Sequence, residues 1–233
     1  MHYFALLLSP ETTRPVDPDE LGTEMAAYQN FHAVAERFIR AGDALAPSAT
    51  GVRITGGPDR PSVTDGPFAE GAEVAGGYYV FEADNLDEAL RLAGQIPAAK
   101  YGAVEIWPMV HWTAPTSPVG NAWLALLLES PDDVNVPDSP EWDARVGEHV
   151  EFGKAAGDHI LAGAPLHPPS TATTVRVRDG KVSFTDGPFV EGAEVANGFY
   201  VLSAADRDEA VKIGSMIPAA SVELRQLADV SGL

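Results

Sequence analysis

TDGPFAEGAEVAGGYYVF (residues 64–81) and TDGPFVEGAEVANGFYVL (residues 185–202) are two forms of one phrase in a chain of 233 residues. The two copies are offset by 121 residues, because 185 − 64 = 121. At that offset, 18 of the 27 positions of Thr64–Leu90 are identical to those of Thr185–Val211. An internal match of this length indicates that a structural unit has been duplicated.

The match extends over almost the whole chain. The tetrapeptide IPAA occurs at Ile96 and again at Ile217, and the apolar run that starts at Tyr3 has a counterpart that starts at Trp123. A module of about 110 residues has a usual domain length. We therefore predict two modules, residues 1–112 and 122–233, joined by a linker at residues 113–121 that is rich in Pro, Thr, Ser and Gly.

Each module shows strand and helix patterns in alternation. In the first copy, apolar or alternating stretches predict strands, and apolar residues three and four apart predict helices. In chain order we predict a strand at Tyr3–Leu8, a helix at Asp17–Ala41 ended by Gly42, strands at Gly51–Thr55 and Glu73–Ala83, a helix at residues 85–96 and a strand at residues 103–109. This β-α-β-β-α-β order is typical of a ferredoxin-like module, whose antiparallel sheet carries both helices on one face.

The second face of such a sheet also needs cover. Phe4 and Leu6 lie on one side of the first strand and Ala5 and Leu7 on the other, and all four are apolar. The second copy can supply a partner sheet. We therefore expect an α+β fold in which two ferredoxin-like modules pack their antiparallel sheets face to face, as an intrachain pseudo-dimer. The sequence leaves open whether two such chains pair further as a homodimer.

Composition restricts the classes of function. The chain has 34 acidic and 15 basic residues and a net charge of −19, which repels phosphate and anionic lipid, so we expect no nucleic-acid or membrane partner. It has no cysteine, which excludes disulfides and thiolate nucleophiles. The apolar run before Ser9 is too short for a signal peptide or a membrane span, so we expect a cytoplasmic protein.

The repeated phrase also resembles a known family. Each copy has TDGPF, then GGYYVFEADNLDEAL or NGFYVLSAADRDEAV, then IPAA and a final VEI or VEL strand. This combination resembles the YCII-related family, in particular its branch marked by DGPF, over nearly the whole chain. The resemblance implies a dimeric α+β barrel, here formed by one chain. That family is similar in fold to small lyases, isomerases and cofactor-free oxygenases, and some of its members use a His–Asp pair.

Asp65 and Asp186 are the first candidate catalytic residues. Each follows a short strand at an Asp-Gly-Pro turn. In the structural interpretation, Asp hydrogen-bonds the nearby backbone, Gly takes a positive φ and Pro fixes the next φ. In the functional interpretation, the turn holds a carboxylate at the mouth of a cleft, where it acts as a general base or orients a histidine. Both interpretations remain open.

His32 and His149 are the second pair of candidates, because each lies in the first predicted helix of its half and would titrate near neutral pH. Their equivalence is open, because they lie at different distances from the following glycines, Gly42 and Gly157. No metal-binding spacing such as HExxH occurs, and we predict neither a metal nor a cofactor. Apolar and aromatic candidates for lining a pocket are Phe4, Tyr79, Trp107, Trp123 and Tyr200.

Two functions fit these residues. In the first, a His–Asp pair in a cavity of each half supports elimination or isomerisation of a small molecule without a cofactor. In the second, the barrel is a non-catalytic module that binds a metabolite or a protein partner, and the aspartates only form turns. The sequence leaves open whether the chain is an enzyme, because the fold alone does not determine function.

Overall fold

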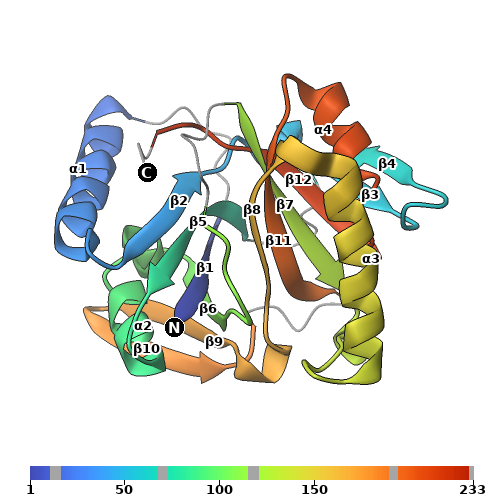
Figure 1. Ribbon diagram of the computed structural model, residues 1–233. Helices are drawn as coiled ribbons and strands as arrows, with labels where there is room; N and C mark the ends of the chain where they lie inside the picture. Colours follow the sequence, from blue (N-terminus) through green and yellow to red (C-terminus); the bar gives the residue numbers. More distant parts are fainter. Residues whose placement is uncertain (11–16, 68–72, 115–120, 189–193, 231–233) are drawn as a thin grey trace.

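The structure is a computed structural model that describes residues 1–10, 17–67, 73–114, 121–188 and 194–230 (Figure 1). Residues 115–120 of the predicted linker lie outside this described part. None of the helices described is long and apolar enough to cross a membrane.

The first half contains the predicted elements and two further strands. In chain order they are β1 (His2–Ser9), α1 (Pro18–Ala35), β2 (Ile39–Ala44), β3 (Val52–Thr55), β4 (Ser62–Asp65), β5 (Val74–Glu82), α2 (Leu86–Ala93) and β6 (Ala103–Pro108). Helix α1 begins where Asp17 accepts a hydrogen bond from the Asp19 backbone N–H at 2.9 Å, with Pro18 in the first turn.

The second half repeats this order. Its elements are β7 (Ala122–Glu129), α3 (Pro140–Ala156), β8 (Ile160–Pro165), β9 (Thr173–Arg178), β10 (Lys181–Asp186), β11 (Val195–Ser203), α4 (Arg207–Gly214) and β12 (Ser221–Gln226). Most of these elements lie 121 residues after their counterparts, which confirms the duplication at the level of structure.

The two halves exchange their hairpins. One sheet has the strand order β10-β9-β6-β1-β5-β2 and the other has the order β4-β3-β12-β7-β11-β8. The hairpin β9–β10 of the second half therefore extends the sheet of the first half, and the hairpin β3–β4 extends the sheet of the second half (Figure 1). Each six-stranded sheet thus consists of four strands of one half and a hairpin of the other.

Backbone pairing and burial both hold the exchanged hairpins. Strand β9 pairs antiparallel with β6, with Val175 opposite Val104, and β3 pairs antiparallel with β12, with Ile54 opposite Val222. Val175 is buried beneath the helices of the first half, and Ile54 is buried beneath those of the second. Each hairpin therefore contributes apolar side chains to the core of the half to which it does not belong.

Ion pairs join the same segments. Arg53 of β3 lies 3.1 Å from Glu194, which directly precedes β11 of the second half. Reciprocally, Arg176 of β9 lies 3.7 Å from Glu73, which directly precedes β5 of the first half. Glu73 and Glu194 are the second glutamates of the two EGAE segments, so the repeated acidic phrase helps to hold each hairpin on the opposite half.

The sheets pack face to face, as predicted. Phe4 and Leu6 of β1 point into the core between the sheets, where the Phe4 and Phe199 rings stack with centroids 4.4 Å apart. Ala5 and Leu7 point the other way, toward the helices. Both faces of the central strand are therefore buried, which explains its unbroken apolar sequence.

Two short bridges close the space between the sheets. Met109, just after β6, pairs with Leu166, just after β8, and Leu45, just after β2, pairs with Leu227, just after β12. The two four-stranded cores, joined in this way along both edges, form a barrel with α1 and α2 outside one sheet and α3 and α4 outside the other (Figure 1).

Two details of the sequence prediction were wrong. The first helix ends at Ala35 and not at Ala41, and residues Ile39–Ala44 form β2. Gly42 lies within this strand, where the Tyr79 ring occupies the position that a Cβ atom would take. The second wrong detail is the sheet of the strand predicted at Gly51–Thr55. This strand is β3, which pairs in the sheet of the other half, and β2 takes its place in the sheet of the first half. Residues Ile39–Ala44 form a strand because they pair with β5, and this pairing cannot be seen in the local sequence pattern.

Candidate functional site

The two long helices share one register against their sheets. The Phe31 ring of α1 meets the Tyr79 ring of β5 edge to face, with centroids 5.4 Å apart. The Phe152 ring of α3 meets the Tyr200 ring of β11 in the same way, with centroids 5.2 Å apart. The offset of 121 therefore holds through the helices, because 152 − 31 and 200 − 79 both equal 121.

This register settles the relation of the two histidines. The counterpart of His149 is Tyr28, because 149 − 121 = 28, and the counterpart of His32 is Gly153. His32 and His149 are therefore not equivalent, and they lie one helical turn apart in the shared register. The glycine that matches Gly42 is Gly163 of β8, and not Gly157, which explains the unequal distances in the sequence.

Each histidine nevertheless hydrogen-bonds the equivalent tyrosine. His32 Nε2 lies 2.7 Å from Tyr79 Oη, and His149 Nδ1 lies 2.9 Å from Tyr200 Oη. The two rings reach the hydroxyl from successive turns of the helix and with different nitrogen atoms. A His–Tyr pair is therefore present in both halves, although it is built differently in each.

The predicted aspartates lie elsewhere. Asp65 ends β4, is exposed, and forms an ion pair with Arg207 of α4. Asp186 ends β10 and is also exposed. Among the described residues, neither aspartate hydrogen-bonds His32 or His149; the hydrogen bonds of these histidines go to tyrosines. Because the hairpins are exchanged, the histidine of each half lies in a helix that covers one sheet, and the aspartate of that half ends a strand of the other sheet.

The two turns after these aspartates differ, because Gly187 has the positive φ that the sequence predicted and Gly66 does not. Gly187 has a φ of +85°, which glycine adopts readily, and its backbone N–H donates to Ala172 O at 2.8 Å. The backbone N–H of Gly66 donates to Gly51 O at 3.0 Å. These bonds tie the end of each hairpin back to its first strand.

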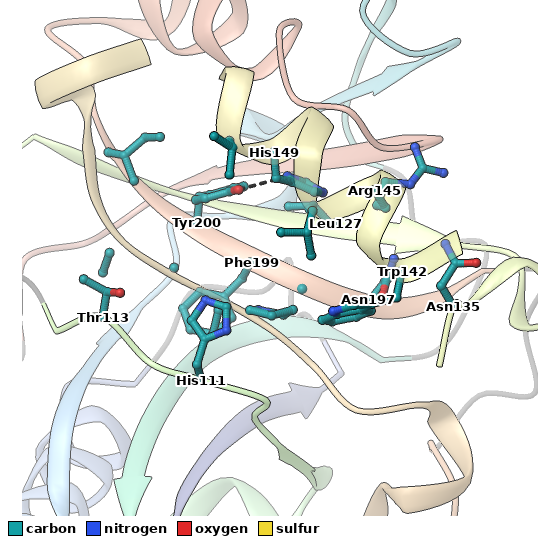
Figure 2. A pocket seen from close by; sticks show the side chains of 18 of the residues that line it. His111, Thr113, Leu127, Asn135, Trp142, Arg145, His149, Asn197, Phe199 and Tyr200 are labelled. Carbon is teal, nitrogen blue, oxygen red and sulfur yellow. Dashed lines mark hydrogen bonds between the residues drawn. The ribbon is translucent and has the colours of Figure 1, made fainter. Parts of the chain in front are cut away.

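A cavity of about 320 Å³ lies beside His149 and Tyr200 in the second half (Figure 2). Helix α3, the edge strand β8 and strand β11 form most of its wall. Its apolar lining includes Leu127, Trp142, Val146, Ile160, Leu161 and Phe199. Its polar lining consists of His111, Thr113, Asn135, Arg145, His149, Asn197 and Tyr200. A mainly apolar cavity of this size with a few converging polar groups has the character of a small-molecule site.

Burial keeps the histidine–tyrosine pair in this cavity uncharged. Desolvation, together with the nearby Arg145 guanidinium, lowers the pKa of His149 to about 4, although Glu148 acts in the opposite direction. Burial raises the pKa of Tyr200 to about 12. At neutral pH the imidazole therefore carries one proton and one lone pair, and the phenol keeps its proton.

The corresponding position in the first half holds other groups. Tyr28 occupies the place of His149, and burial raises its pKa while a hydrogen bond with Tyr101 lowers it. The Tyr101 hydroxyl donates in turn to Glu24, the counterpart of Arg145. A chain of tyrosines and a carboxylate thus stands where the second half has a histidine and an arginine.

Two of the sequence candidates line this cavity, His149 from the catalytic set and Tyr200 from the pocket-lining set. Phe4, Trp107 and Trp123 were also expected to line a pocket, and they lie in packed cores instead. The sequence candidates did not include Trp142, Arg145, Asn135 and Asn197. The signal that was available is the departure from the repeat at offset 121, because the first half has Leu21, Glu24 and Gly76 opposite Trp142, Arg145 and Asn197.

Among the described residues, no group of three or more His, Asp or Glu side chains is arranged to hold a metal ion. A family described as the YCII-related domain matches this chain twice, at residues 4–113 and 123–230. A comparison with curated proteins finds no match. A crystal structure of a protein described as a candidate chlorite dismutase is similar over 98% of this chain and 94% of the other, with 9% sequence identity and a TM-score of 0.44. At that score the likeness says nothing about the reaction.

Proposed function

The chain belongs to the YCII-related domain family through both of its halves, and on that premise we propose that its second half binds a small organic carbonyl compound and transfers protons to and from it. The cavity beside α3 is the binding site, and His149 with Tyr200 is the reactive pair. The observation that carries this proposal is that a hydrogen-bonded, uncharged acid and base line the same mainly apolar cavity.

The chemistry needs only groups of the chain itself. In the tautomer with the proton on Nδ1, His149 donates to Tyr200 Oη and keeps a lone pair on Nε2. Nε2 takes a proton from the carbon beside the ligand carbonyl, Tyr200 gives its proton to the carbonyl oxygen, and Nδ1 returns a proton to Tyr200. The ligand becomes an enol, and the imidazole changes tautomer without a net change of charge. Return of a proton to another carbon gives isomerisation.

Asp65 and Asp186 take no part in proton transfer in this proposal. Asp65 pairs with Arg207 across the boundary between the halves, and Asp186 ends the other exchanged hairpin. We assign both to the hairpin turns and not to proton transfer. His32 forms its pair in the first half, outside the cavity of the second.

The test is the exchange of carbon-bound protons for deuterium. Methyl ketones of suitable size, starting with acetophenone, are incubated with the protein in D₂O, and loss of the α-proton signal is followed by NMR. We expect the protein to accelerate exchange, and His149→Phe to slow it at least 10²-fold, a usual effect of losing a general base. Tyr200→Phe should also slow exchange.

The duplication supplies matched controls. His32→Phe and Tyr79→Phe change the equivalent pair in the first half, and Asp65→Asn and Asp186→Asn change the two aspartates. All four should keep the exchange rate. Loss of exchange in an aspartate variant that remains folded would instead favour a His–Asp site. Ketone binding without any accelerated exchange would contradict the catalytic role and favour the alternative, a module that only binds its ligand.

A further inference from the structure

The lining of the cavity departs from the charge of the rest of the molecule. The chain carries 34 acidic residues, yet none of the described residues that line the cavity is Asp or Glu. Arg145 is the one lining residue among them that carries a permanent charge. The lining of the cavity therefore differs in charge from the chain as a whole, whose net charge is −19.

The charge of Arg145 is directed away from the cavity. Its guanidinium donates to Glu148 Oε2 at 3.0 Å and to Pro218 O at 3.5 Å, and it lies 3.9 Å from the buried Glu129. Arg145, Glu148 and Pro218 all line a second, more open groove on the other side of α3. Figure 2 shows the guanidinium turned away from the labelled side chains of the cavity.

Apart from the imidazole of His111, which lies after β6 and is exposed, the remaining polar groups are neutral. Asn135 and Asn197 offer amide groups, Thr113 offers a hydroxyl, and His149 with Tyr200 forms the uncharged pair described above. An imidazole or phenol held neutral by burial shows that the local environment disfavours charge. The same environment would act on a bound ligand.

We propose that this cavity selects uncharged, mainly apolar ligands of about ten non-hydrogen atoms that carry a hydrogen-bonding oxygen. The size follows from the volume of about 320 Å³ and a share of about 30 Å³ for each water-sized group. This inference rests on the proposed function, since it concerns the same cavity. A carboxylate or an ammonium group would lose its hydration there, and the one permanent charge of the lining, on Arg145, is already paired with Glu148 and Glu129.

Four probes of nearly equal size test this selectivity. Acetophenone and benzamide are neutral, benzoate is an anion and benzamidinium is a cation. Dissociation constants are measured by ligand-observed NMR with the full chain at pH 7. We expect each neutral probe to bind at least tenfold more tightly than either charged probe.

Two tryptophan variants locate the binding. Val146 lines the cavity and its side chain is exposed, so Val146→Trp fills the cavity without enlarging a buried core residue. Met25 is its counterpart in the first half and is also exposed, so Met25→Trp places the same bulk on the equivalent helix. Binding of the neutral probes should be lost in Val146→Trp and kept in Met25→Trp.

The outcomes separate the two proposals. If benzoate or benzamidinium binds as tightly as the neutral probes and loses binding in Val146→Trp, the charge selectivity is wrong, while the cavity remains a ligand site. If the neutral probes bind selectively but acetophenone shows no accelerated exchange, the selectivity stands and the catalytic role falls. If no probe binds, or if Val146→Trp binds all four probes unchanged, both proposals are overturned.

Discussion

Tyr79 and Tyr200 are equivalent residues of the two halves, but their surroundings differ. Both tyrosines pack against a phenylalanine of the neighbouring helix, and both bond a histidine. In the first half the histidine, His32, directly follows the phenylalanine, Phe31. In the second half His149 lies three residues before Phe152. The same scaffold thus holds a similar pair in two different ways.

This comparison shows which residues the fold requires. Positions that are identical in the two copies hold the exchanged hairpins or the strands, as Glu73 and Glu194 do through their arginine partners. Several positions around the cavity differ between the copies, as Tyr28 and His149 do, although Tyr200 is identical to its counterpart Tyr79. Differences between the halves therefore mark several polar residues of the candidate site, and identity alone does not separate architecture from that site.

The largest expected effect tests the hairpin exchange. Ile54 belongs to the first half but is buried in the core of the second, so Ile54→Ala should lower the free energy of unfolding by about 3 kcal/mol. Hydrogen exchange should show the loss of protection in β7, β11 and β12. Val63 pairs with Ile54 from the outer strand β4 and its side chain is exposed, so Val63→Ala should change stability by less than about 0.5 kcal/mol. Loss of protection confined to β1, β5 and β6 would contradict the exchange.

The next effect is the pH dependence that His149 contributes. Its pKa is about 4 in the folded chain and about 6.5 in an unfolded one. The unfolded state therefore binds the proton first, and stability falls as the pH drops from about 6.5 to 4. We expect a loss of about 2 kcal/mol at pH 4, after allowance for partial exposure.

Denaturant unfolding at pH 7 and pH 4 measures this loss. His149→Phe removes the titrating group, so the variant should lose about 2 kcal/mol less than the wild type over the same interval. The groups near this imidazole are Tyr200, Arg145 and Glu148. His32→Phe serves as the control in the first half. If both variants change the loss of stability between pH 7 and pH 4 by the same amount, His149 is not more strongly desolvated than His32.

The smallest expected effect concerns Gly42 and Gly163, which lie against the rings of Tyr79 and Tyr200. A Cβ atom on Gly163 would lie 2.6 Å from Tyr200 Cδ1 and 2.9 Å from Phe199 O, and Gly42 is equally crowded by Tyr79. Gly163→Ala and Gly42→Ala should each lower the free energy of unfolding by about 1–2 kcal/mol. Only Gly163→Ala should weaken acetophenone binding, because only that change moves a ring that lines the cavity. Equal binding by both variants would contradict the location of the site.

Much of the fold could be predicted because its signals are local. The offset of 121 was visible in the repeated phrase, and the apolar residues on both sides of β1 predicted a sheet buried on two faces. The strand β2 was missed because IRAGDA has little strand character, and its pairing with β5 decides its conformation. For the site, the histidine and tyrosine types were found, but their pairing was not, because it depends on the register of a helix against a sheet.

The duplication, the α+β class and the packing of one sheet on the other could be predicted, because periodicity and repetition are properties of the chain alone. Tertiary contacts were needed to show that the hairpins cross to the opposite sheets, that His149 meets Tyr200, and that the aspartates lie apart from both histidines. This is because a hairpin presents the same backbone donors and acceptors to either sheet edge. Which edge it joins depends on side chains more than a hundred residues away, such as Glu194 opposite Arg53.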